Sequence, residues 1–193
     1  MIIGIPKEIK TGEQRVAMTP ANIEFFIDKG LQVLFQTDAG SAAGYPDAEY
    51  TAAGATLISD RAEIFSKADV ILQVQSFGSN NENSDDDLAR LRNGQLVIGM
   101  MDPLASPSAA QAVADMGATA IALELVPRIS RAQSMDVLSS MATLAGYKAV
   151  LMGASAAPRI FPMLMTAAGT LQPARVLIMG VGVAGLQACA TAK

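Results

Sequence analysis

The sequence lacks residues and segments on which whole classes of protein depend. It has one cysteine, Cys189, so it cannot form a disulfide within the chain, and this favours an intracellular setting. It has no tryptophan and only 5% aromatic residues, which suits helices packed on a sheet better than a β-sandwich. The formal net charge of −4 argues against a nucleic-acid-binding surface.

Long apolar runs are also missing. A membrane span needs about 18–20 apolar residues, and the best candidate, residues 141–169, is interrupted by Lys148, Pro158, Arg159 and Pro162. The N-terminus leads into a strand pattern and then charged residues, without the features of a signal peptide. We therefore expect a cytoplasmic chain without a membrane span.

Apolar runs alternate with amphipathic segments over the first two thirds of the sequence. Strands are predicted at 2–5, 32–36, 55–58, 70–74, 96–100 and 119–123. Helices are predicted at 20–29, 47–53, 60–66, 85–91 and 106–116, with start signals such as Asp60 and end signals such as Gly30. This alternation predicts an α/β fold with a mostly parallel, doubly wound sheet.

The pattern changes near Asp136, where long helices of small residues are predicted as far as about Ala168, followed by a strand at 175–179. We therefore expect an N-terminal α/β lobe at residues 1–138 and the start of a second Rossmann-like lobe at residues 139–193. The second lobe is expected to contain connecting helices, a first strand, a glycine-rich turn and a first helix, with the rest of it absent. A cleft between two such lobes commonly binds a dinucleotide.

The most informative segment is an apolar run, residues 176–179, followed by glycines in the spacing G-x-G-x-x-G. Gly180 would permit the tight turn, Gly182 would let the backbone approach a pyrophosphate, and Gly185 would let the next helix pack closely. The N–H groups at the start of that helix would face the phosphates. An acidic residue for the ribose is expected about 20 positions further on. The alternative is a glycine-rich structural turn.

Residues 126–140 concentrate two arginines, an amide, an acid and several hydroxyls between a strand and a helix. The simpler interpretation is a capped helix, with Ser134 or Asp136 as the N-cap and the arginines on the surface. Because a cap uses only one of these groups, we favour a segment that faces a ligand. We interpret Asp85, Asp86 and Asp87 as carboxylates at a helix start in a solvated loop, so no metal site is expected.

Three segments resemble the superfamily of alanine dehydrogenases and nicotinamide nucleotide transhydrogenases. They are Gly4-Ile5-Pro6-Lys7-Glu8 continuing through residues 13–20, the segment 128–140 and the turn 180–185. The first and third are shared by both branches. The sequence RISRAQSMD at residues 128–136 resembles only the transhydrogenase branch, in the NAD(H)-binding part of its alpha subunit.

Two absences agree with that branch. Alanine dehydrogenases use a lysine and a histidine near the substrate carbonyl, whereas this sequence has no histidine and reads ILQVQ at 71–75 and GMMDP at 99–103 at the matching places. Oxidising an amino acid moves a proton as well as a hydride. Hydride exchange between two nicotinamides instead needs two close, oriented rings and the exclusion of water.

The resemblance implies an NAD(P)(+) transhydrogenase subunit, the NAD(H)-binding component of a proton-translocating enzyme that transfers hydride between NADH and NADP(+) bound on a partner domain. It implies that the nicotinamide end of NAD(H) contacts Arg128, Gln133, Asp136 and Ser139, with Gln133 and Asp136 as catalytic positions. It implies a pyrophosphate cradle formed by Gly180, Gly182, Val183, Ala184 and Gly185. It also implies a homodimer and a position peripheral to the inner membrane, through NADP-binding and membrane subunits.

Several alternatives stay open. We interpret Arg15 as an ion-pair partner of Glu8 or Glu13, although the matching arginine of alanine dehydrogenases holds the substrate carboxylate. Tyr147 either packs near the cofactor or is a helix residue with its hydroxyl at the surface. The competing functions are an alanine dehydrogenase-like amino-acid oxidoreductase and a non-catalytic nucleotide-binding fragment. Alone, the chain is expected to bind NADH poorly and to associate.

Overall fold

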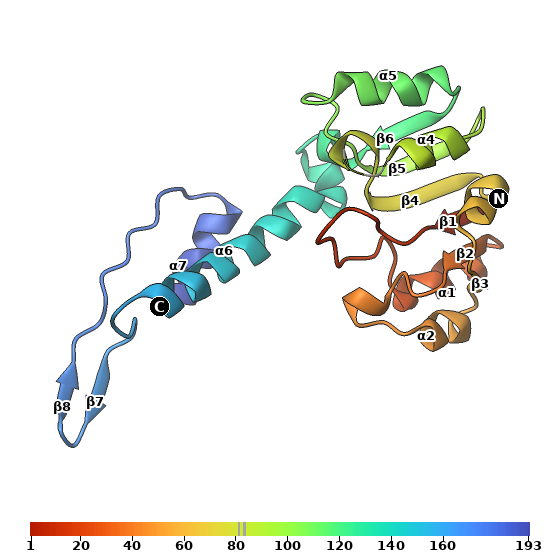
Figure 1. Ribbon diagram of the computed structural model, residues 1–193. Helices are drawn as coiled ribbons and strands as arrows, with labels where there is room; N and C mark the ends of the chain where they lie inside the picture. The colour runs from red at the N-terminus through yellow and green to blue at the C-terminus, as the bar shows by residue number, and fades with distance from the viewer. Residues whose placement is uncertain (81, 83) are drawn as a thin grey trace. The chain divides into compact units, whose positions relative to one another are not determined.

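A computed structural model describes residues 1–80, 82 and 84–193 (Figure 1). The chain divides into two compact units, Met1–Val126 (unit 1) and Pro127–Lys193 (unit 2). Asn81 and Asn83, which belong to the polar stretch before the predicted helix at 85–91, lie outside the described residues. The proposed division into lobes at residue 138 stays a prediction.

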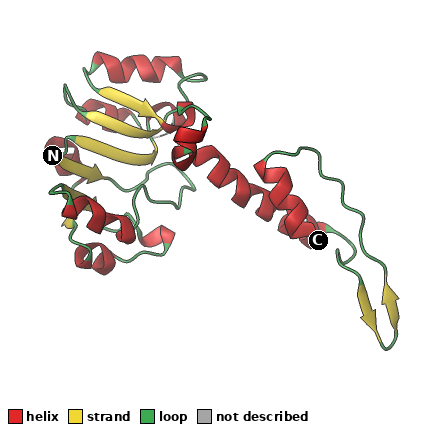
Figure 2. Cartoon of the chain, turned by 180° about the vertical axis from the view of Figure 1, so that it is seen from behind, coloured by secondary structure: helices red, strands yellow, loops and turns green. Residues whose placement is uncertain are grey.

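Unit 1 is built on a six-stranded sheet in which every pair of neighbouring strands is parallel (Figures 1 and 2). The strand order is β3-β2-β1-β4-β5-β6. The strands are β1 (Ile2–Ile5), β2 (Gln32–Gln36), β3 (Thr56–Ile58), β4 (Val70–Gln75), β5 (Leu96–Met100) and β6 (Thr119–Ala122). The chain reverses its winding direction between β1 and β4, so the open parallel α/β sheet predicted from the alternating pattern is confirmed.

Five helices connect these strands, and each begins and ends within two residues of its predicted bounds. They are α1 (Pro20–Asp28), α2 (Asp47–Ala52), α3 (Arg61–Lys67), α4 (Asp85–Arg90) and α5 (Pro107–Asp115), with short 3-10 turns η1 (Ser41–Ala43), η2 (Phe77–Ser79) and η3 (Leu123–Leu125). The Asp60 carboxylate accepts a hydrogen bond from the Ala62 N–H at 2.9 Å, which caps α3. Gly30 after α1 has a φ of +76°, a conformation that favours glycine.

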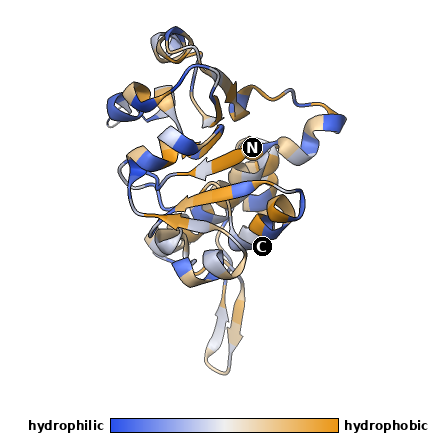
Figure 3. Ribbon diagram, turned by 90° about the vertical axis from the view of Figure 1, so that its right-hand side faces the viewer, coloured by the Kyte–Doolittle hydropathy of each residue, from blue (hydrophilic) through white to orange (hydrophobic). Residues whose placement is uncertain are grey.

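The core of unit 1 has two parts because strand residues alternate between the two faces of the sheet. On one face Ile3, Ile5, Val33 and Phe35 pack with Ile23 of α1 and Tyr50 of α2. On the other, Ile71 and Val97 pack with Ile64 and Phe65 of α3 and Val113 of α5. Figure 3 shows the strands mostly in the hydrophobic colour. Helices therefore cover both faces and leave the carboxyl ends of the strands as the open edge.

Unit 2 contains the 3-10 turn η4 (Ser130–Met135), the long helix α6 (Val137–Ala156), a hairpin of β7 (Leu164–Thr166) and β8 (Gly169–Leu171), and α7 (Val183–Ala192). The prediction of helices as far as residue 168 is wrong beyond Ala156. Pro158 and Pro162 cannot continue a helix, because proline lacks the N–H donor and clashes with the preceding turn. Gly169, with a φ of +134°, begins the second strand of the hairpin.

Helices α6 and α7 lie side by side (Figures 1 and 2). A Cβ atom added at Gly146 of α6 would lie 2.1 Å from the Ala184 carbonyl oxygen, so only glycine allows this approach. Gly146 and Val150 are the buried residues of α6, and Ala188 is the buried residue of α7. Small side chains therefore set the position of α7 on α6.

The predicted strand at 175–179 does not form, and residues 172–182 belong to no helix or strand and have no ladder partners in the described chain. A parallel strand needs the backbone groups of a neighbour for its hydrogen bonds, and unit 2 supplies none at this place. Its apolar side chains are consequently open to solvent, with Leu177 86% and Met179 90% exposed. The prediction of a first strand for the second lobe is thus wrong for this chain.

By length and composition alone, α6 could cross a membrane. The expectation that the chain has no membrane span, which was based on the interrupted apolar run at 141–169, stays a prediction. Lys148 lies within the helix, and core helices of soluble proteins pass the same test.

Candidate functional site

The polar segment 128–139 is organised around the start of α6. Asp136 is the N-cap of the helix, and its Oδ1 accepts a hydrogen bond from the Ser139 N–H at 2.9 Å. Its second oxygen, Oδ2, accepts from the Ser139 hydroxyl at 2.7 Å. Of the two caps considered from the sequence, Asp136 is therefore the one used. Capping fixes the carboxylate relative to the helix axis.

Arg128 completes a small network with these two residues. Its Nη2 donates to the Ser139 hydroxyl at 2.9 Å, and its Nε lies 3.5 Å from Asp136 Oδ2. The hydrogen bonds from Ser139, and in smaller part the positive charge of Arg128, lower the pKa of Asp136. The carboxylate is therefore ionised at neutral pH. The structure thus brings together Arg128, Asp136 and Ser139.

Gln133 is not a member of this network. Its side chain is exposed, and within the described residues of the chain its amide makes no hydrogen bond. The amide therefore keeps both its donor and its acceptor available to a ligand. Tyr147, further along α6, is 48% exposed, and both interpretations of it stay open.

The glycine turn takes a conformation that requires two of its glycines. Gly180 has a φ of +117°. A Cβ atom at Gly185 would lie 2.0 Å from the Gly180 carbonyl oxygen, whereas one at Gly182 would meet no atom within 4 Å. Gly182 is the N-cap of α7, and the first N–H groups of the helix have no intrahelical acceptor. The turn thus leaves open space in front of a helix N-terminus.

Gly146 belongs with this turn, although the sequence interpretation did not single it out. Its contact with the Ala184 carbonyl fixes the first turn of α7 against α6, the helix that Asp136 caps. Both predicted segments are therefore attached to one helix within unit 2. The sequence did contain a sign of this close contact, because Gly146 stands four residues before Val150 and therefore on the same face of the helix.

Unit 2 also differs from unit 1 in charge. It contains six Lys and Arg residues and a single acidic residue, Asp136, for a net charge of +5, whereas unit 1 carries −9. The one acid is already engaged by Arg128 and Ser139. The positive balance of unit 2 favours an anionic ligand.

The open edge of unit 1 holds a different cluster, at the point between β1 and β4 where the winding reverses. Glu8 accepts hydrogen bonds from the N–H groups of Val74 and Gln75 at 2.6 and 3.0 Å, and burial raises its pKa. Arg15 donates to both oxygens of Glu13, at 2.7 and 2.6 Å, and Gln75 donates to the same carboxylate at 3.0 Å. These bonds, chiefly those from Arg15, lower the pKa of Glu13 to about 2.

The interpretation of Arg15 as an ion-pair partner of Glu13 is confirmed by this geometry. Its guanidinium is satisfied from within the chain at the place where open α/β sheets usually bind ligands. The side chain of Gln75 is turned to the same carboxylate.

Sequence reasoning missed a buried ion pair in unit 1. Arg61 donates to both oxygens of Asp87, at 2.7 and 2.5 Å, and the two side chains are only 14% and 3% exposed. The prediction that Asp85, Asp86 and Asp87 stand at a helix start is confirmed, because all three lie in the first turn of α4, but Asp87 is buried against α3 rather than solvated. Asp86 does lie at the surface, with its side chain 85% exposed.

Comparison with known proteins places this geometry in a family. The model of the alanine dehydrogenase/PNT N-terminal domain matches residues 4–145, and that of the C-terminal domain of the same family matches residues 149–193. The first portion of the NAD(P) transhydrogenase alpha subunit of Rhodospirillum rubrum is 48% identical over 193 residues, which are 100% of this chain and 50% of that protein. An alanine dehydrogenase of Halomonas elongata is 35% identical over 188 residues, 96% of this chain and 48% of that protein.

A solved structure gives the same result. The transhydrogenase from Sinorhizobium meliloti matches with a TM-score of 0.90 and 44% identity, covering 100% of this chain and 53% of that one. The chain thus spans about half the length of the relatives it matches. Because the N-terminal model alone covers residues 4–145, most of the chain, the protein belongs to the alanine dehydrogenase/PNT family.

Proposed function

We propose that this chain is the NAD(H)-binding component of a proton-translocating transhydrogenase, which transfers hydride between NADH and NADP(+) bound on a partner domain. One observation carries the proposal. Arg128, Asp136 and Ser139 form a fixed polar network at the start of α6 that contains no group able to exchange a proton at neutral pH. Such a network orients a ligand without acid–base chemistry.

Hydride exchange between two nicotinamides needs orientation and no proton transfer. When bound, the nicotinamide ring supplies or accepts the hydride. Asp136 offers an acceptor and Arg128 a donor to its carboxamide, and Ser139 holds both side chains in place. The free amide of Gln133 is able to contact the second nucleotide. We therefore assign Gln133 and Asp136 to the catalytic positions and Arg128 and Ser139 to cofactor binding.

The phosphate end is assigned to the glycine turn. The space in front of Gly182 and the N–H groups at the start of α7 suit a pyrophosphate, which a helix N-terminus favours. The net charge of +5 on unit 2 supports an anionic ligand there. The proposed cradle consists of Gly180, Gly182, Val183, Ala184 and Gly185.

Amino-acid oxidation is the less supported alternative. Arg15, which would hold a substrate carboxylate, already binds Glu13 through two hydrogen bonds, at 2.7 and 2.6 Å. The sequence has no histidine, and the segment 71–75 contributes Gln75 rather than a lysine. A reaction that moves a proton with its hydride lacks an evident acid–base group in these segments of the chain.

The proposal extends to partners and location. NADP(H) would be held by a separate domain, and membrane subunits would couple the exchange to proton movement, with this chain on the cytoplasmic side. Relatives whose names make them the first portion of an alpha subunit support the existence of further subunits. A homodimer belongs to the same proposal.

The test is a hydride-exchange assay on the full-length gene product. NADH and an NADP analogue are mixed with a purified NADP-binding partner domain, and a parallel reaction contains NADH, pyruvate and ammonium. Asp136→Asn keeps a cap but removes the charge, and we expect the exchange rate to fall about 100-fold because misplaced reactants lose about that much. Ser134→Ala, outside the network, is the matched control and should change little.

The pH dependence provides a second readout. Because the pKa of Asp136 is lowered from an ordinary 3.8, its carboxylate stays ionised from pH 6 to 8, and the exchange rate should be flat over that range. Turnover only with pyruvate and ammonium, or a rate that titrates near pH 6.5 in the partner-saturated assay, would contradict the proposal.

A further inference from the structure

Asp136 is the joint between two elements of unit 2, because it ends η4 and caps the start of α6. Its backbone, with a φ of −78° and a ψ of 87°, is not helical. Its N–H donates to the Gln133 carbonyl at 3.3 Å, and its carbonyl accepts from the Ser140 N–H at 3.5 Å. Backbone hydrogen bonds usually measure about 2.7–3.2 Å. Main-chain bonds alone therefore hold this joint loosely.

The Ser140 hydroxyl supplies a shorter bond at the same place. It donates to the Asp136 carbonyl oxygen at 3.0 Å, beside the longer bond from its own N–H. The carboxylate of Asp136 is held separately, because Ser139 donates to both of its oxygens, at 2.9 and 2.7 Å. Ser139 thus fixes the side chain of Asp136, and Ser140 fixes its main chain.

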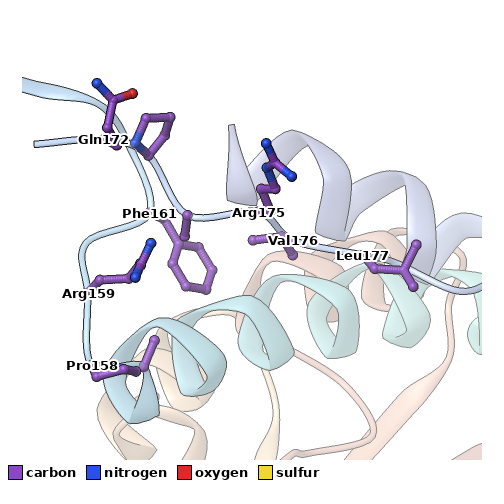
Figure 4. A pocket seen from close by; sticks show the side chains of 10 residues that line it. Pro158, Arg159, Phe161, Gln172, Arg175, Val176 and Leu177 are labelled. Atoms are coloured by element: carbon purple, nitrogen blue, oxygen red, sulfur yellow. The ribbon is translucent and has the colours of Figure 1, made fainter.

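The charged side chains elsewhere in unit 2 do not converge in this way. Arg159 and Arg175 lie on opposite sides of the Phe161 ring (Figure 4). Within the described residues, the ion pair at the start of α6 is the only one in unit 2. Ser140 therefore acts at the one point in this part of the chain where opposite charges of the unit meet.

Other helices contain hydroxyl bonds of the same spacing, but their acceptors differ. Thr51 donates to the Asp47 carbonyl at 3.1 Å in α2. Thr191 donates to the Gln187 carbonyl at 2.8 Å in α7. Both of these carbonyls belong to residues inside a helix, whereas Asp136 precedes its helix and has a non-helical backbone. A hydroxyl bond inside a regular helix adds little, but at a joint it decides the orientation of the residue that it holds.

We propose that Ser140 is a positioning residue for hydride exchange, whose hydroxyl holds Asp136, and through it Gln133, in the orientation that the nicotinamide requires. The assignment rests on the proposed function, in which Asp136 and Gln133 are the catalytic positions. It extends that function to a residue that acts through Asp136 rather than on a nucleotide. Because Ser140 is exposed and water competes for its bond, we expect a moderate effect on the rate.

The experiment measures hydride exchange by the full-length gene product with the NADP-binding partner domain. We expect Ser140→Ala to lower kcat about 3- to 10-fold, since a single hydrogen bond changes an equilibrium by roughly that factor. Ser140→Thr keeps a hydroxyl, and threonines make the same bond in α2 and α7, so its kcat should stay within about twofold. Thr51→Val and Thr191→Val remove this kind of bond from other helices, and as matched controls they should also stay within about twofold.

Ligand binding separates a positioning role from a general loss of structure. ADP-ribose is NADH without its nicotinamide, so Ser140→Ala should weaken NADH and leave ADP-ribose affinity unchanged. The assignment is overturned by equal weakening of both ligands, by an unchanged kcat in Ser140→Ala, by a Ser140→Thr variant as slow as Ser140→Ala, or by equal loss in Thr191→Val. If the unchanged protein exchanges no hydride, the proposed function itself is contradicted, and the assignment with it.

Discussion

Among single residues, Asp87 has the largest expected effect on the stability of unit 1. It accepts two hydrogen bonds from Arg61, at 2.7 and 2.5 Å, and a weaker one from Gln73 at 3.3 Å. Arg61 in turn donates to the Lys7 carbonyl at 2.6 Å, so the pair connects α3, α4 and the segment after β1. Burying two charges is costly, and the cost is offset only while both partners remain.

Replacing Asp87 by asparagine should therefore leave the Arg61 guanidinium buried without its counter-charge. We expect Asp87→Asn to lower the free energy of unfolding by about 3–5 kcal/mol. Asp86→Asn is the matched control one residue earlier, where the side chain is 85% exposed and lies 3.6 Å from Arg90. Exposed pairs contribute about 0–1 kcal/mol. Urea unfolding of both variants measures the difference, and equal midpoints would show that the buried pair does not stabilise the fold.

Local polar contacts were predictable from the sequence and distant ones were not. Asp60 and Asp136 cap helices within three residues of themselves, and Arg15 pairs with Glu13 two residues away. Each of these depends on the local backbone alone. The Arg61–Asp87 pair joins residues 26 positions apart, and it exists because α3 and α4 cover the same face of the sheet. No sequence pattern of charges specifies that packing.

At the scale of elements, the strands of unit 1 were predicted well because each has neighbours. Short apolar runs such as 96–100 become strands when ladders form on both sides, as β5 does between β4 and β6. The run at 175–179 has a similar composition and forms no ladder in the described chain. The sequence pattern indicates only that a segment is suited to a buried strand. Whether it becomes one depends on the presence of partners.

The contact between α6 and α7 is the element-scale feature that is most open to test. A Cβ atom at Gly146 would lie 2.1 Å from the Ala184 carbonyl oxygen, so Gly146→Ala must push α7 away from α6. We expect it to lower the melting temperature of unit 2 and to weaken NADH binding by the full-length gene product. Gly153→Ala is the control in the same helix, where the nearest atom is the Phe161 Cζ at 3.9 Å.

Gly153→Ala should be neutral or stabilising by up to about 1 kcal/mol, because alanine favours a helix over glycine. Far-UV circular dichroism during heating and NADH fluorescence measure the two properties. A melting temperature for Gly146→Ala that equals or exceeds that of Gly153→Ala would mean that the close approach of the two helices is not required.

At the scale of the whole molecule, the two units combine opposite charge with different exposure of apolar residues. Unit 1 carries −9 and has its apolar strand residues in two cores. Unit 2 carries +5 and exposes apolar residues before and within the glycine turn, among them Leu177, Met179 and Val181 at 86, 90 and 89%. Molecules of this chain could therefore associate through exposed apolar surface or through attraction between opposite charges. Sulfate strengthens the apolar association, whereas salt weakens the attraction between exposed charges.

We expect the exposed apolar run to cause association of this chain. Met179→Lys interrupts the run, and sedimentation velocity should show a smaller weight-average mass than for the unchanged chain. Leu104→Lys is the control, because Leu104 is 82% exposed yet lies in unit 1 apart from that run, and it should leave the mass unchanged. Sulfate should strengthen an apolar association, since it favours burial of apolar surface. If salt instead dissolves the assemblies and Met179→Lys has no effect, attraction between the oppositely charged units is the cause, because salt screens exposed charges.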